Sequence, residues 1–131
     1  MNPKLTADDA FDLSKQFHDL STAVGDYRYK NVDAITPAQM ARLKDAQFML
    51  LNQSSHMITE AVGLELDDGQ AGLAALNGVT AKAQKALKNI ANIKKGIEIT
   101  AALVKLGAAV ASENPAAIAA ATQDAVTTIT G

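Results

Sequence analysis

The chain has 131 residues, of which 48% are hydrophobic, 20% charged and 4% aromatic, and its formal net charge is −2. This length and composition fit one folded domain, because such a chain buries enough surface for a core without metal or disulfide staples. Cysteine is absent, which excludes disulfide scaffolds, iron–sulfur clusters, thiolate zinc sites and cysteine nucleophiles. The abundance of alanine, the three prolines and the scarcity of aromatic residues favour an all-α protein.

Apolar spacing and capping residues predict a helical bundle of four to five helices. The expected helices cover residues 6–29, 37–62, 70–95, 97–112 and 115–129. We expect a single domain over residues 1–131. In it, residues 1–95 form the main body of the bundle, and residues 96–131 form an apolar, alanine-rich hairpin that packs on this body or on a partner.

The first helix is expected to begin at Thr6, whose hydroxyl caps free backbone amides. Asp8 and Asp9 then lie in the positive first turn. Apolar residues follow at alternating steps of three and four, which indicates one seam of bundle packing. This seam consists of Ala10, Leu13, Phe17, Leu20, Val24 and Tyr27.

The second helix has the clearest start, with Thr36 as cap, Pro37 at the first helical position and Gln39 reaching back to the cap. Gly63 is its expected terminator. Its apolar stripe consists of Met40, Leu43, Leu50, Leu51, Met57, Ile58, Ala61 and Val62. Gln47 and Ser54 interrupt this stripe and need partners, since an unpaired buried amide costs about 1 to 3 kcal/mol. They form either a polar layer that fixes the helix register, which we favour, or the lining of a ligand cavity.

A turn at Asp67-Asp68-Gly69 leads into a third helical stretch, residues 70–112. Unbroken, this stretch would be about 64 Å long. We therefore expect a bend or break, and place it at Lys94-Lys95-Gly96 because glycine costs about 1 kcal/mol inside a helix. Before this point the lysines lie away from a single apolar stripe, which consists of Leu76, Val79, Ala83, Leu87, Ile90 and Ile93.

Beyond Gly96 the helix has two apolar faces. One continues the earlier stripe with Ile97, Ala101, Val104 and Ala108. The other consists of Ile99, Leu103, Leu106 and Val110. Burying these last four side chains contributes on the order of 6 to 12 kcal/mol, so this face must be covered. We predict that it is an interaction face for self-association or for a protein partner.

The second apolar face has three possible neighbours, namely the protein's own helices, another subunit, or lipid. A single membrane span is not expected, because residues 97–111 extend about 22 Å against roughly 30 Å of hydrocarbon. Asn114 and Pro115 open a last helix, and the two short alanine-rich helices then form a hairpin. This hairpin resembles the apolar hairpins of helical pore-forming toxins. The resemblance implies a membrane-active protein whose hairpin inserts into lipid or lies on it.

Signals for catalysis and for metal or cofactor binding are poor. His18 and His56 are the only imidazoles, and neither belongs to a Glu-x-x-His or His-Glu-x-x-His pattern. His56 and Glu60 share a helical face, but two ligands do not make a metal site. The helix dipole explains Asp8 and Asp12. We therefore predict no catalytic residue, no cofactor and no metal.

The two halves of the chain differ in charge. Residues 1–68 hold eleven acidic and six basic residues, and residues 69–131 hold three acidic and six basic residues. The lysines from Lys82 to Lys95 suggest nucleic-acid contact, but no aromatic residue follows Phe48 to stack on bases. A solvated helix face is favoured. Phe11 and His18, seven apart and off the main seam, form a small contact patch, unless Phe11 lies at the edge of the core.

These patterns predict a non-enzymatic interaction or assembly protein, whose partner is another protein or a second copy of the chain. The alternative is a membrane-active protein that uses its C-terminal hairpin, and the third possibility is an enzyme with an unrecognised site. No small-molecule substrate is inferred. The sequence shows no signal peptide and no full-length membrane span, so the expected location is the cytoplasm, with membrane association as the alternative.

Overall fold

Five α-helices make up most of the chain. The computed structural model describes residues 4–66 and 70–130, so the turn expected at Asp67-Asp68-Gly69 lies outside the described residues. The helices are α1 (Ala7–Lys30), α2 (Pro37–Glu60), α3 (Gln70–Asn89), α4 (Ile93–Ala111) and α5 (Pro115–Thr130). The predicted all-α bundle is confirmed.

Capping side chains define where α1 and α2 begin, as the sequence predicted. The Thr6 hydroxyl accepts a hydrogen bond from the backbone N–H of Asp9, and the Asp9 carboxylate accepts one from the Thr6 N–H. Thr36 and Gln39 make the same reciprocal pair at the start of α2, with Pro37 at its first position. These capping boxes satisfy backbone donors that a helix start leaves free.

The end of α2 is tied to the N-terminal segment. α2 ends at Glu60, two residues before the expected end, and Gly63 then adopts a left-handed conformation with φ of 80°. The Leu5 N–H donates to the carbonyl of Leu64 at 2.9 Å, and the Gly63 N–H donates to the carbonyl of Leu5 at 2.8 Å. These bonds close one end of the α1–α2 pair.

The break between α3 and α4 lies at residues 90–92, so its predicted position at Lys94-Lys95-Gly96 is wrong. Asn92 has an extended conformation, and its side chain accepts a hydrogen bond from the Lys95 N–H at 3.1 Å, which caps α4. Gly96 is buried within α4, where a β-carbon would collide with the Tyr27 hydroxyl. Glycine at this position therefore permits a close contact between helices and does not end one.

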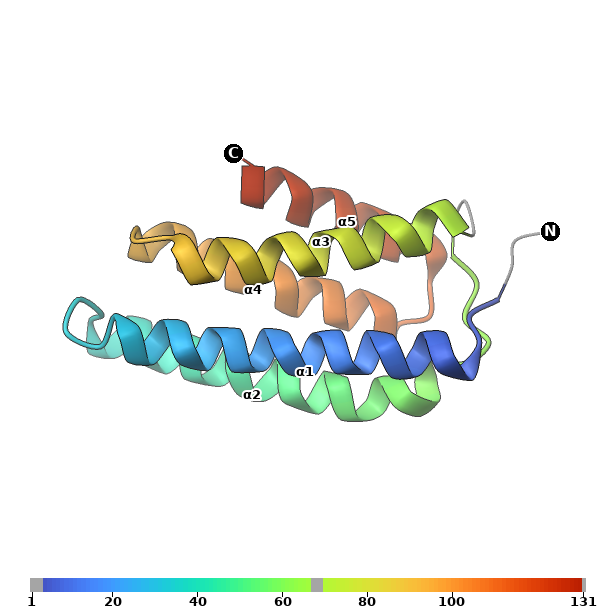
Figure 1. Ribbon diagram of the computed structural model, residues 1–131, viewed down its shortest axis with the longest axis horizontal. Helices are drawn as coiled ribbons and strands as arrows, with labels where there is room; N and C mark the ends of the chain where they lie inside the picture. Colours follow the sequence, from blue (N-terminus) through green and yellow to red (C-terminus); the bar gives the residue numbers. More distant parts are fainter. Residues whose placement is uncertain (1–3, 67–69, 131) are drawn as a thin grey trace.

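The helices form three layers, as Figure 1 shows. α1 and α2 make an antiparallel hairpin, α3 packs on α1 and α4 packs on α2. α5 packs against α4 and α3 on the side away from the hairpin. The α3–α4 layer is thus covered on two sides, whereas the α1–α2 hairpin is covered on one side only.

Burial follows the predicted stripes on α1 and α3 but not on α2. All six residues of the α1 seam are buried, as are the first four of the α3 stripe. On α2, Leu43, Leu50 and Met57 are buried, but Leu51, Ile58 and Val62 are exposed. Their predicted place in the core is therefore wrong, because α1 and α4 cover only part of the wide apolar arc of α2.

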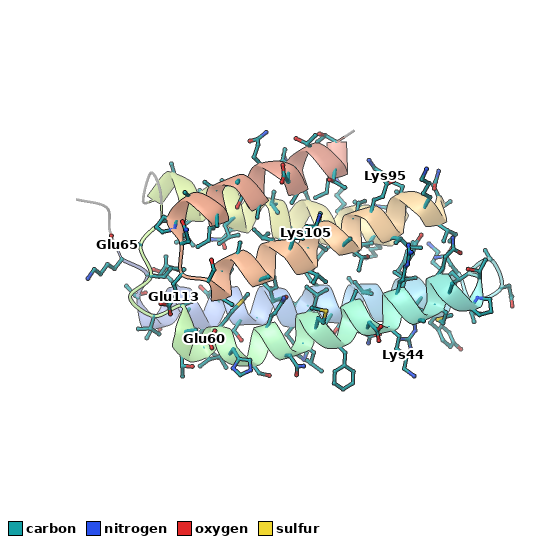
Figure 2. All side chains as sticks on the ribbon, turned by 180° about the vertical axis from the view of Figure 1, so that it is seen from behind. Lys44, Glu60, Glu65, Lys95, Lys105 and Glu113 are labelled. Atoms are coloured by element: carbon teal, nitrogen blue, oxygen red, sulfur yellow. The ribbon has the colours of Figure 1, made fainter. Side chains whose placement is uncertain are left out.

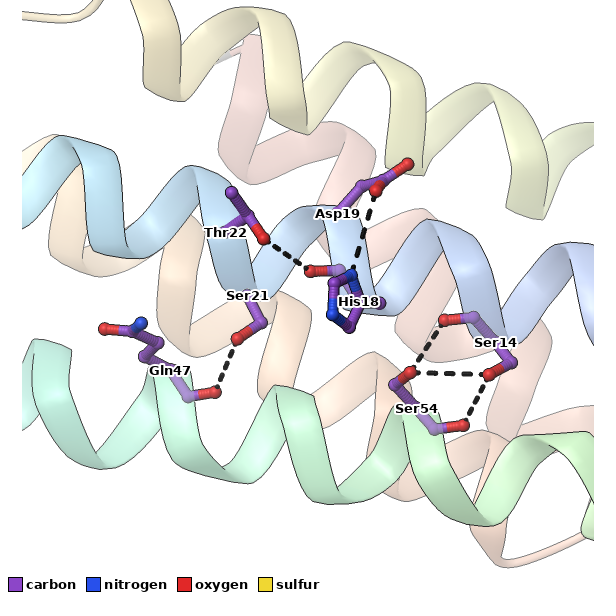
Figure 3. A network of polar contacts seen from close by, with 7 residues as sticks. All are labelled: Ser14, His18, Asp19, Ser21, Thr22, Gln47 and Ser54. Atoms are coloured by element: carbon purple, nitrogen blue, oxygen red, sulfur yellow. Dashed lines mark hydrogen bonds and ion pairs between the residues drawn. The ribbon is translucent and has the colours of Figure 1, made fainter.

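Serine hydroxyls fix the register between α1 and α2 (Figure 3). The Ser14 hydroxyl donates to the carbonyl of Ser54 at 2.6 Å, and the Ser54 hydroxyl donates to the carbonyl of Ser14 at 2.8 Å. Seven residues further along α1, the Ser21 hydroxyl donates to the carbonyl of Gln47 at 3.1 Å. The Gln47 side chain accepts a hydrogen bond from Arg28 of α1 at 3.0 Å. Both predicted polar residues of α2, Gln47 and Ser54, thus have partners on α1, as a layer that fixes the register requires, and their seven-residue spacing is typical of bundle packing.

Candidate interaction surface

The predicted interaction face on α4 lies inside the molecule. Ile99, Leu103, Leu106 and Val110 are each at most 1% exposed and belong to the hydrophobic core of the chain itself. The assignment of these four residues to a partner-binding face is therefore corrected, because the protein's own helices cover them.

The position of α4 in the middle layer explains its two apolar sides. The Gln53 side chain of α2 reaches across one side of α4, where its amide donates to the carbonyl of Val104 at 3.1 Å. Towards α5, Ala102, Ala109 and Ala121 are partly buried against the core. A helix between two layers needs apolar residues on more than one side, which accounts for the buried face of α4. Of the other predicted face, Ile97 and Val104 are partly buried, whereas Ala101 and Ala108 are exposed.

The exposed apolar side chains lie elsewhere, in the first half of the chain. Among the described residues, all eight large hydrophobic side chains with substantial exposure fall between residues 11 and 62. They are Phe11, Tyr29, Val32, Phe48, Met49, Leu51, Ile58 and Val62. The described parts of α3, α4 and α5 expose no side chain of this kind. Of the two outer layers, the α1–α2 hairpin and α5, the described residues of the hairpin expose large apolar side chains and those of α5 do not.

Five of these side chains share the outer side of the α1–α2 hairpin, which we call the outer face. Phe48, Leu51, Ile58 and Val62 are 64%, 39%, 48% and 47% exposed. Together with Lys44 and Ser55, which are also exposed, Phe48, Leu51 and Ile58 recur along α2 at steps of four, three, four and three, and Val62 follows in the turn after the helix. This spacing places them on one side of the helix, as in the contact seam of a coiled coil.

Phe11 joins the outer face from α1. The bonds between Ser14 and Ser54 set its level along the hairpin, beside Met57 and Ile58 of α2. At 100° per residue, Phe11 lies about 60° from Ser14, on the side away from the buried seam of α1. Its side chain is 58% exposed, which argues against the core-edge alternative, and the contact patch of Phe11 with His18 stays a prediction.

The pattern of α2 contained a signal for this face that the sequence analysis missed. From Met57 round to Phe48, the apolar positions of α2 cover about 180° at 100° per residue, which is wider than one packed stripe. Sequence alone does not reveal which part of such an arc is covered. That depends on the neighbours of α2, which are α1 and α4.

The outer face runs between two ends of different charge. The acidic end, residues 4–17 and 51–66, carries five carboxylates and two lysines. The other end, residues 18–50, balances four carboxylates with Arg28, Lys30, Arg42 and Lys44. Figure 2 shows Lys44 and Glu60 towards opposite ends of α2, with Glu65 near the Glu60 end. The outer face thus carries apolar side chains, and the net charge of the hairpin is negative at one end and balanced at the other.

The histidines lie on the surface. His18 is exposed, with its Nδ1 4.0 Å from an Asp19 carboxylate oxygen (Figure 3). His56 Nδ1 lies 3.7 Å from a Glu60 oxygen, also in an exposed pair. No group of three His, Asp or Glu side chains in the described residues is placed to hold a metal ion.

Tyr27 is a titratable residue of α1 with a buried side chain. Its side chain is buried between α1 and α4, and its hydroxyl donates to the carbonyl of Asn92 at 3.3 Å. Burial raises the pKa of Tyr27 above its ordinary value. This bond and the contact with Gly96 give Tyr27 a role in packing.

One surface groove carries charges of both signs. A groove of about 910 Å³ between α1 and α3 is lined by Asp19 and Asp26 on one side and Lys85 and Lys88 on the other. Lys82, Lys85 and Lys88 are exposed on α3, whereas Lys94 and Lys95 belong to α4. The lysine cluster is therefore divided between two helices.

The properties of the helices and the comparisons with known proteins were both searched for a sign of function. No helix in the described part of the chain combines the length and the apolar character that crossing a membrane requires. Searches against family models, curated proteins and solved structures find no match to this chain. The described residues form an all-α bundle with exposed apolar side chains on the outer face of the α1–α2 hairpin.

Proposed function

We propose that this protein is a non-enzymatic interaction or assembly protein, and that the outer face of the α1–α2 hairpin is its contact surface. The observation that carries this proposal is the segregation of exposed apolar side chains. Phe11, Phe48, Leu51, Ile58 and Val62 lie on the side of the α1–α2 hairpin on which no other described helix packs. Exposed apolar surface concentrated in one region is typical of protein contact sites.

The proposal moves the contact surface from α4 to α2. The membrane alternative of the sequence analysis requires α4 to release Leu103 and Leu106 from the core. That release costs several kcal/mol of burial, a large part of the stability of a small domain. Contact through the outer face requires no such rearrangement.

A photo-crosslinking amino acid tests the contact surface directly. We expect the probe at Phe48 to form adducts with another polypeptide, because Phe48 is the most exposed of the large apolar side chains of the outer face. The control carries the probe at Met49, which is similarly exposed on the same helix but lines a groove against α4. The adducts should disappear when Leu51→Glu and Ile58→Glu are added. Equal adducts at both positions, or none at Phe48, would overturn the proposed surface.

A further inference from the structure

We infer that the outer face is occupied by a second copy of this chain, packed with the two α2 helices antiparallel. This inference rests on the proposed contact surface and names its partner. It follows from the spacing of the residues along α2 and from the charges at the two ends of the hairpin.

The seam on α2 is complementary to itself when one copy is reversed. Its positions within the helix are 44, 48, 51, 55 and 58, and Val62 lies in the turn that follows. The steps between 48, 51, 55 and 58 read the same in both directions. Reversal about residue 53 sets Phe48 opposite Ile58 of the second copy and Leu51 opposite its Ser55. Each large side chain then meets a complementary position, and each contact occurs twice, as a two-fold symmetric interface requires.

The layers of the molecule allow this packing. The outer face is formed by two antiparallel helices side by side, and no other described helix lies on it. Two such hairpins placed face to face make a four-helix arrangement in which every neighbouring pair is antiparallel. This is the ordinary packing of helical bundles, and α3, α4 and α5 lie on the far side of each copy.

Charge selects the orientation in which α2 faces α2. The alternative two-fold arrangement places α1 of one copy on α2 of the other and brings both acidic ends together. Asp8, Asp12, Glu60 and Glu65 of the two copies would then gather at one end, where Lys4 and Lys15 are the only described basic residues on the hairpin. With α2 on α2, the acidic ends lie apart by up to the length of α1, about 36 Å.

The same orientation places a lysine of one copy and an aspartate of the other at similar heights along the helix axes. Reversal about residue 53 places Lys44 level with Val62 of the second copy. Because the serine bonds set the register of α1 against α2, Asp8 of the second copy lies about two residues from this level. A lysine near an aspartate favours association, whereas like charges oppose it. The position of Lys44 therefore favours a second copy of the chain, packed with α2 on α2, as the partner.

Sedimentation equilibrium over a dilution series tests self-association. We expect the wild-type chain to dimerise reversibly, and Leu51→Glu with Ile58→Glu to weaken the dimer at least tenfold. Met49→Glu is the control, since it adds one negative charge at a similarly exposed apolar position of α2 outside the outer face, and it should leave the dimer unchanged. Leu51→Glu alone, which adds one charge within the outer face, is the variant matched to it. Circular dichroism checks that each variant is folded.

Engineered thiols test the orientation, because the natural chain has no cysteine. We expect a mixture of Leu51→Cys and Ser55→Cys, one of them carrying a mass tag, to form the mixed 51–55 disulfide at least tenfold faster than either symmetric one. Faster symmetric disulfides would overturn the antiparallel register. The thiol of an Ala119→Cys variant on α5 reports the rate of random collision.

The outcomes separate this inference from the function on which it rests. A wild-type chain that stays monomeric while the probe at Phe48 captures a different protein overturns self-association and leaves the contact surface standing. A dimer that Leu51→Glu with Ile58→Glu does not weaken overturns both. Co-sedimentation with phosphatidylcholine vesicles, lost in that double variant, would assign the outer face to lipid and also overturn the dimer.

Discussion

Three glycines within helices lie where a neighbouring helix inserts a long side chain. A β-carbon on Gly25 would lie 2.7 Å from the Gln47 amide nitrogen, and one on Gly107 would collide with the amide of Gln53. At Gly96 the obstacle is the Tyr27 hydroxyl. Glycine lowers helix propensity, so its presence at these positions reflects the space that the neighbouring side chains need.

The substitution Gly96→Ala should destabilise the protein. Alanine favours the helix by about 1 kcal/mol, but overpacking against Tyr27 typically costs about 1 to 3 kcal/mol, so we expect a net loss of stability in urea unfolding. Gly78→Ala is the control. A β-carbon there meets nothing within 4 Å, so this variant should gain up to about 1 kcal/mol. Equal gains at both positions would contradict the close contact at Gly96.

At the scale of the helices, the sequence predicted starts better than ends. Thr6, Thr36 and Asn114 were recognisable as caps, because capping depends on residues within one turn. The break before α4 was misplaced, because glycine has several structural uses and the sequence does not distinguish them. Asn92, three residues before Lys95, was the local signal for the actual start.

The substitution Asn92→Ala should therefore destabilise the protein by about 1 kcal/mol, through loss of the cap on α4. Asn89→Ala is a suitable control, since the Asn89 side chain is exposed and bonds only to the carbonyl of Lys85 in its own helix. Thermal unfolding followed by circular dichroism measures both. If the two variants unfold at the same temperature, Asn92 does not set the boundary between α3 and α4.

At the scale of the whole molecule, the layers decide which apolar residues are covered. Both α2 and α4 carry apolar side chains over more than one stripe, and the sequence assigned the uncovered face to α4. The structure places α4 between two layers and leaves part of α2 exposed. Helical periodicity describes a single helix, whereas coverage depends on contacts between helices distant in sequence. This is why the five helices were predictable and the place of the exposed apolar side chains was not.

The central claim is that the apolar face of α4 belongs to the core and the outer face of α2 does not. Urea unfolding of Leu103→Ala and Leu51→Ala, in solution dilute enough to keep the chain monomeric, tests it most directly. We predict a loss of about 2 to 5 kcal/mol for Leu103→Ala and of less than about 1 kcal/mol for Leu51→Ala. Equal losses for the two variants, or a larger loss for Leu51→Ala, would contradict the claim.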